Sequence, residues 1–159
     1  MRILVAMMLL FTMPASAAVS VVDGDTIRID GIRTRLWGFD APERRQRCVI
    51  NGVDRAIGQE ASEGLEAILA GGELRCEVRD HDHYGRAVAE CWVDGQSIAD
   101  QMVRHGWAWA LPRFSGDRFL AAQEEAERTH RGIWAGDGCE APARFRDRQR
   151  HREPPPPGD

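Results

Sequence analysis

The most constraining feature of this chain is the dipeptide Asp30-Gly31, which lies between two segments that alternate apolar and polar residues. Residues 26–29 and 32–36 supply that alternation. An Asp-Gly pair between such segments is the strongest short-range signal for a β-hairpin. We expect the second strand to continue to Asp40, and Pro42 to end it, because proline cannot donate to a strand ladder. The folded part of the chain therefore begins as antiparallel sheet.

The rest of the chain adds strands first and helices later. A polar, irregular stretch at 44–55 is expected to be a loop. The remaining elements are predicted at 59–70 (helix), 74–78 and 87–93 (strands), 97–106 (helix, with Ser97 as N-cap) and 117–131 (helix). Such an order favours a small, partly closed β-barrel with packed helices over a parallel α/β sheet.

The two ends of the chain have compositions unlike the middle. Residues 1–17 combine Arg2, an apolar run too short to cross a bilayer and the small residues 15–17, which is the pattern of an export signal. From residue 142 the chain becomes rich in arginine and then proline, which predicts a solvated, disordered tail over 142–159. The remaining 18–141 fit the size of a single domain.

Charge and cysteine content narrow the class of protein further. The formal net charge is −4, whereas a generic nucleic-acid binder would be basic, so any nucleic-acid function must depend on a local site. The four cysteines have no C-x-x-C spacing, which argues against a zinc site. In an oxidising compartment they could pair in three ways, and the residues alone leave all three open.

Three short clusters carry the groups that phosphate chemistry requires, namely residues 23–26, 35–43 and 82–86. They contain carboxylates at strand ends, a further glutamate and two arginines. Calcium prefers oxygen ligands, and phosphodiester cleavage needs an activated water with cations around the phosphate oxygens. Taken singly, each cluster could also be a turn, a loop start or hairpin packing.

In their order, these clusters resemble the staphylococcal-nuclease (thermonuclease) family. The family pattern is D-G-D-T, then R-L-x-x-[IVF]-D-[AT]-P-E, then D-x-Y-G-R, and this chain has all three, followed by G-W-A at 106–108 and G-I-W at 132–134. The resemblance implies a five-stranded OB-fold barrel packed with three α-helices.

The resemblance also implies roles for individual residues. Calcium would be bound by Asp25, Asp40 and the main-chain carbonyl of Ala41. The catalytic group would be Arg35 and Arg86, which hold the phosphate and stabilise its transition state, and Glu43, which orients or deprotonates the attacking water. Tyr84 would lie against the nucleotide, with Asp23 and Asp82 as supporting residues.

On this basis the sequence predicts a secreted or periplasmic, calcium-dependent nuclease that cuts DNA and RNA and leaves 3′-phosphate ends. We expect a monomer with no membrane association after export. A non-catalytic OB-fold module that binds nucleic acid is the main alternative, but such a module would be expected to lack Glu43 or one of the two arginines. A glycosidase with two carboxylates would have no role for paired arginines.

The family topology bears on the cysteines as well. It pairs the strands on either side of 84–86 as a hairpin, which implies a Cys76–Cys91 disulfide and leaves Cys48 to pair with Cys139.

Overall fold

The computed structural model describes residues 18–151, and the predicted signal segment 1–17 and the end of the tail, 152–159, lie outside the described residues. One sheet contains, in spatial order, β1 (Val19–Asp23), β2 (Thr26–Ile29), β3 (Ile32–Leu36), β8 (Ala87–Val93) and β7 (Leu74–His81). The strands β3 and β8 are parallel and the other neighbours are antiparallel, with β9 (Gln96–Ser97) added to β8. The hydrogen-bonded path described here ends at β1 on one side and at β7 on the other.

The first hairpin is confirmed in the predicted place. Asp30 and Gly31 both have positive φ, at 48° and 85°, as a two-residue type I′ turn requires. The register pairs Ile29 with Ile32 and Thr26 with Arg35. This hairpin therefore fixes the position of Arg35 relative to the turn that precedes β2.

Two smaller strand pairs complete the sheet structure. The strand β4 (Phe39–Asp40) pairs with β10 (Trp109–Ala110), and β5 (Cys48–Ile50) pairs with β6 (Val53–Arg55). The prediction of a loop over 44–55 was wrong from residue 48 onward, where the β5–β6 hairpin begins. The turn between β5 and β6 is Asn51-Gly52, again with positive φ at both residues, 51° and 79°.

The described residues form five α-helices rather than three. They are α1 (Ile57–Leu69), α2 (Ile98–Arg104), α3 (Pro112–Ser115), α4 (Leu120–Arg128) and α5 (Pro142–Arg150), with the 3-10 helices η1 (Gly116–Phe119) and η2 (Gly132–Trp134). The Ser97 side chain caps α2 by accepting from the Asp100 N–H at 3.3 Å, as predicted. The sheet-dominated OB-type fold with packed helices is confirmed, and α3 and α5 are additions to it. No helix in the described part of the chain is both long and apolar enough to span a bilayer.

Two apolar clusters make up the core. The larger lies among the sheet, α1 and α2, and its most buried large side chains are Ile27, Leu36, Phe39, Leu65 and Met102. The smaller contains Ile50, Ile57 and Ile133, packed against Cys48 and Cys139. The structure contains the disulfides Cys48–Cys139 and Cys76–Cys91, which confirms the expected pairing. The first disulfide ties the β5–β6 hairpin to the chain that precedes α5.

A buried ion cluster joins the sheet to the helical part of the fold. Glu90 on β8 is 1% exposed and accepts hydrogen bonds from Arg79 on β7 and Arg118 in η1. Burial raises the pKa of Glu90, but the hydrogen bonds from Arg118 and Arg79 outweigh it and hold that pKa below its usual value. The Arg118 guanidinium also lies over the Trp37 ring, 5.1 Å from its centroid. A carboxylate buried in this way needs its cationic partners, so the cluster holds η1 against β8.

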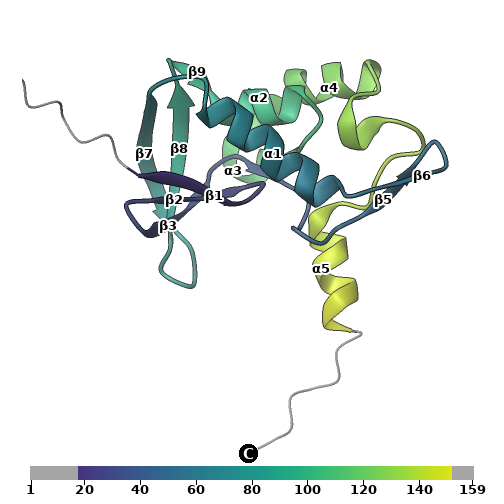
Figure 1. Ribbon diagram of the computed structural model, residues 1–159, viewed down its shortest axis with the longest axis horizontal. Coiled ribbons are helices and arrows are strands. Elements are labelled where there is room, and N and C mark those ends of the chain that lie inside the picture. Colours follow the sequence, from purple (N-terminus) through teal and green to yellow (C-terminus); the bar gives the residue numbers. More distant parts are fainter. Residues whose placement is uncertain (1–17, 152–159) are drawn as a thin grey trace, which may run out of the picture.

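The disordered tail predicted from residue 142 begins instead with a helix. Pro142 occupies the first turn of α5, where its missing N–H is not needed, and it is the one buried residue of that helix. Figure 1 shows α5, in yellow, projecting from the body of the molecule near the β5–β6 hairpin. The arginine-rich segment therefore has a defined position relative to the rest of the fold.

Candidate active site

Two predicted calcium ligands meet around one arginine. Asp25 lies in the turn between β1 and β2, Arg35 lies on β3 and Asp40 ends β4. A single guanidinium nitrogen, Arg35 Nη2, is 2.9 Å from Asp25 Oδ2 and 2.9 Å from Asp40 Oδ1. Asp25 is 7% exposed and Asp40 is 4% exposed. The fold thus places two nearly buried carboxylates close enough together to share one cationic group.

The turn before β2 holds Asp25 in place. The Asp25 N–H donates to Asp23 Oδ1 at 3.3 Å, and the Thr26 hydroxyl donates to Asp25 Oδ1 at 3.0 Å. A Cβ on Gly24 would lie 2.7 Å from the Ala41 Cβ, so only glycine allows this turn to pack against the chain that follows Asp40. The D-G-D-T motif is therefore a packing device as well as a source of carboxylates.

Glu43 lies in a loop whose positioning residues the sequence did not reveal. Its N–H donates to Gln46 Oε1 at 3.1 Å, and Gln46 is 1% exposed although it stands in a polar run. A Cβ on Gly58, in the first turn of α1, would lie 1.9 Å from the Glu43 carbonyl oxygen. Gln46 and Gly58 thus set the backbone of Glu43. No local pattern marks them, because both depend on how α1 packs against the loop.

The remaining predicted residues form a second group at the β7–β8 turn. Asp82 accepts from the N–H groups of Tyr84 and Arg86, at 3.0 and 2.9 Å, and from Arg86 Nε at 2.6 Å. The Arg86 guanidinium lies 5.6 Å from the centre of the Tyr84 ring. Burial raises the pKa of Asp82, but these bonds from Arg86 and Tyr84 lower it below its usual value. Asp82 therefore fixes the direction in which Arg86 points.

The two groups are neighbours through the parallel pair of strands. Arg86 immediately precedes β8, and Ala87 and Val88 of β8 pair with Thr34 and Arg35 of β3. The described contacts join neither Arg86 nor Tyr84 directly to the carboxylates of Asp25, Asp40 or Glu43. The site is therefore two clusters that the pairing of β3 with β8 brings side by side. The first cluster consists of Asp25, Arg35, Asp40 and Glu43, and the second of Asp82, Tyr84 and Arg86.

An arginine from the segment predicted to be a disordered tail also contacts the first cluster. Arg146 of α5 donates from Nη1 to Glu43 Oε1 at 2.7 Å and from Nη2 to Asp40 Oδ2 at 3.1 Å. Burial lowers the pKa of Arg146, but the bonds to Asp40 and Glu43 raise it above its usual value overall. Glu43 and Asp40 thus share one guanidinium, as Asp25 and Asp40 share another.

The burial of Asp25 affects its protonation. Burial raises the pKa of Asp25 to about 7 against the pull of Arg35, and the nearby Asp23 and Asp40 carboxylates add to the rise. At neutral pH and without a metal, this carboxyl is therefore divided between its two forms.

This raised pKa predicts that the metal-free protein becomes more stable as pH falls from about 8 toward 5. Over that range Asp25 gains a proton in the fold, whereas in the unfolded chain, with the ordinary pKa of 3.8, it stays ionised. The folded state then binds more protons, so the free energy of unfolding rises as pH falls. Urea unfolding in chelator should show a flatter pH dependence for Asp25→Asn than for the wild type. Equal slopes would contradict the raised pKa.

The oxygen atoms of the first cluster supply some of the ligands that a hard cation such as calcium requires. Calcium takes six to eight oxygen ligands, and Asp25, Asp40 and the chain at Ala41 offer carboxylate and carbonyl oxygens. Across residues 18–151, however, no three acidic, histidine or cysteine side chains are grouped as a metal site. An ion here would rely on two carboxylates, with main-chain and water oxygens for the rest. Asp25 and Asp40 already lie close enough together to contact one cationic nitrogen, so a metal cation could contact both carboxylates as well.

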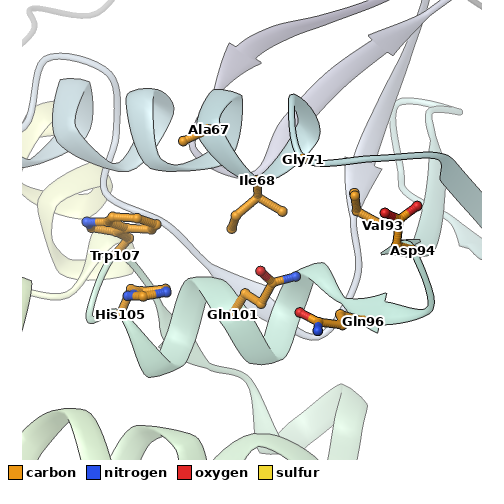
Figure 2. A pocket seen from close by; sticks show the side chains of 9 residues that line it. All are labelled: Ala67, Ile68, Gly71, Val93, Asp94, Gln96, Gln101, His105 and Trp107. Carbon is orange, nitrogen blue, oxygen red and sulfur yellow. The ribbon is translucent and has the colours of Figure 1, made fainter.

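A separate cavity of about 350 Å³ lies at the far end of α1 from Glu43. Figure 2 shows Ile68 of α1 facing Gln101 of α2 across it, with His105 and Trp107 at one end. The rings of His105 and Trp107 stack with centroids 4.7 Å apart. None of the predicted site residues lines this cavity, so it is distinct from the acidic site.

Fold and site together define an OB-type domain that carries an acidic, arginine-bearing site at its strand ends. The family model described as "Staphylococcal nuclease homologue" matches residues 33–136. The "Succinoglycan biosynthesis protein ExoI" of Rhizobium meliloti (strain 1021) is 36% identical over 124 residues, which are 76% of this chain and 65% of that protein. An "Uncharacterized endonuclease" of Escherichia coli O157:H7 is 31% identical over 123 residues, 74% of each chain. The "Probable staphylococcal-like nuclease CAN1" of Oryza sativa subsp. japonica is 31% identical over 129 residues, 80% of this chain and 36% of the plant protein.

This chain belongs to the family of staphylococcal nuclease homologues. It spans just under two thirds of the rhizobial protein and about a third of the rice protein. The helix α5, with Arg146, lies beyond the matched residues 33–136.

Proposed function

We propose that this protein is a calcium-dependent endonuclease that hydrolyses phosphodiester bonds in DNA and RNA and leaves 3′-phosphate ends. The observation that carries the proposal is the convergence of Asp25 and Asp40 on Arg35. Buried carboxylates of this kind attract a cation, and the guanidinium between them is a phosphate-binding group. The names of related proteins, which include endonucleases and a probable nuclease, support the same chemistry.

In this proposal each side chain has a separate task. Arg35 and Arg86 bind the non-bridging phosphate oxygens, and they bind them more tightly as charge builds up in the transition state. Glu43 orients a water and takes its proton while the water oxygen bonds to phosphorus. The bond from phosphorus to the 5′ oxygen breaks, and that oxygen takes a proton from solvent. Tyr84, which is 74% exposed, would contact the nucleotide.

Asp25, Asp40 and the Ala41 carbonyl would hold the calcium. When bound, that ion supplies a positive charge that polarises the phosphate and neutralises the two buried carboxylates. Without it, ionised Asp25 and Asp40 depend on arginine for compensation.

A binding module without catalysis is the alternative. Glu43 weighs against it, because a module that only bound nucleic acid would gain nothing from a carboxylate beside the phosphate. The acidic formal charge of −4 also argues against retention of nucleic acid by general electrostatics.

Incubation with DNA and RNA, with calcium and then with excess chelator, tests the proposal. We expect cleavage in calcium and its loss in chelator, because the buried carboxylates then have no divalent partner. Asp40→Asn should weaken calcium binding, whereas Glu43→Gln should bind calcium and fail to cleave. End-group analysis should find phosphate on the 3′ side. Cleavage that persists in chelator, or tight binding of uncleaved nucleic acid by the wild type in calcium, would rule the proposal out.

We also propose that the protein acts after export, in the periplasm or outside the cell, as a monomer. Two disulfides are typical of an oxidising compartment, and their presence supports this location. N-terminal sequencing of the protein from the culture or periplasm should begin at Ala18, and a start at Met1 would contradict export.

A further inference from the structure

Arg146 is the residue of α5 that contacts the acidic cluster, which consists of Asp25, Asp40 and Glu43. Its Nη1 lies 2.7 Å from Glu43 Oε1 and 3.4 Å from Asp40 Oδ1, and its Nη2 lies 3.1 Å from Asp40 Oδ2. These contacts bridge more than a hundred residues of sequence. A segment outside the matched family residues therefore places a second guanidinium on two side chains of the proposed reaction.

The helix is fixed firmly at its base and weakly along its length. The Cys48–Cys139 disulfide and a 2.6 Å hydrogen bond from Gln46 Nε2 to the Glu140 carbonyl hold the chain just before α5. Within α5 itself only Pro142 is buried. Figure 1 shows the helix projecting from the body. A half-exposed ion pair from Arg148 to Glu140 adds to the base, and the pairing of Arg146 with Asp40 and Glu43 joins α5 to the rest of the fold.

The contacts of Arg146 with Asp40 and Glu43 conflict with the proposed chemistry. Glu43 must be available to a water molecule, and Asp40 must offer its oxygens to a divalent cation. The guanidinium binds both carboxylates, and a cation bound at Asp40 would repel it as well as compete for the same oxygens. Arg146 and the cation are thus alternative partners of one cluster.

We propose that α5 is an autoinhibitory latch, in which Arg146 occupies Asp40 and Glu43 until a divalent cation displaces it. The proposal depends on the proposed function, because it regulates that same site. Calcium would then have a second effect: besides assembling the catalytic centre, it would release Glu43 and detach α5 from the cluster.

The test compares the wild type with Arg146→Gln and with Arg150→Gln. The control removes the same charge from the same helix, but Arg150 pairs with Asp147 within α5 and not with the acidic cluster. Calorimetric titration should show calcium binding about 10-fold tighter for Arg146→Gln, the effect expected when a charged hydrogen-bonded competitor is lost. Arg150→Gln should bind as the wild type does. Arg146→Lys should fall between the two, because lysine lacks the fork that spans two carboxylates.

Hydrogen exchange of the α5 amides gives a readout independent of catalysis. In the wild type, calcium should speed exchange over residues 143–151, whereas in Arg146→Gln exchange should already be fast without it. Equal calcium affinity in Arg146→Gln and wild type would overturn the latch. So would a loss of cleavage by Arg146→Gln at saturating calcium, since that result would make Arg146 a phosphate contact. If the wild type neither binds calcium nor cleaves, the proposed function fails first and the latch fails with it.

Discussion

Replacing Arg86 with alanine is expected to lower kcat by about 10²–10³-fold, the usual cost of losing one preorganised donor to a transition state. The structure explains why this arginine is suited to the task. Asp82 binds its Nε at 2.6 Å and accepts from its N–H at 2.9 Å, so the guanidinium direction is set before substrate arrives. Arg86→Lys should recover little activity, because lysine offers a single mobile ammonium in place of the planar fork.

A matched control is available on the neighbouring strand. Arg75 on β7 is exposed and pairs with Glu77, so Arg75→Ala removes the same charge without touching either cluster. Steady-state cleavage at saturating substrate and calcium should leave Arg75→Ala near the wild-type kcat. If Arg86→Ala also keeps that rate, Arg86 does not act on the transition state. Arg35→Ala is a less clean experiment, because it also leaves Asp25 and Asp40 without their shared partner.

Removing the Cys48–Cys139 disulfide is expected to lower the free energy of unfolding by about 4–5 kcal/mol in the loop-entropy model. The two cysteines are 91 residues apart, against 15 for Cys76–Cys91, whose loss should cost about 3 kcal/mol in the same model. Urea unfolding of the Cys48→Ser/Cys139→Ser and Cys76→Ser/Cys91→Ser variants, without reductant, measures both costs. The reverse order would show that residual structure in the unfolded chain, rather than loop length, determines them.

Much of the fold and half of the site follow from local sequence patterns. The hairpin at Asp30-Gly31 is such a case, since turn chemistry and alternation act within a few residues. The same signal was present at Asn51-Gly52, where it was missed because the flanking segments are short and lie in a charged stretch. Asp25, Arg35 and Asp40 were named because their motifs resemble those of a known family, and the structure places these three side chains in contact.

The parts that escaped prediction depend on tertiary packing. Gln46 looks like a surface residue in a polar run, and only the fold shows it buried between the Glu43 loop and Glu140. The helix start at Pro142 could have been read from the sequence, because proline favours the first helical turn. The contact from Arg146 to Glu43 could not, since a long side chain on an exposed helix carries no mark of its partner.

The parallel pairing of β3 with β8 has a consequence for the order in which the molecule folds. The strands β1, β2 and β3 can pair as local hairpins as soon as they exist, but β3 and β8 are joined by a connection of about fifty residues that contains α1 and β7. Closing so long a connection is slow compared with forming a hairpin. Arg35 and Arg86 become neighbours only in that late step. A chain that has formed its first three strands and nothing more therefore carries the acidic turn and one arginine, but not the assembled site of the proposed reaction.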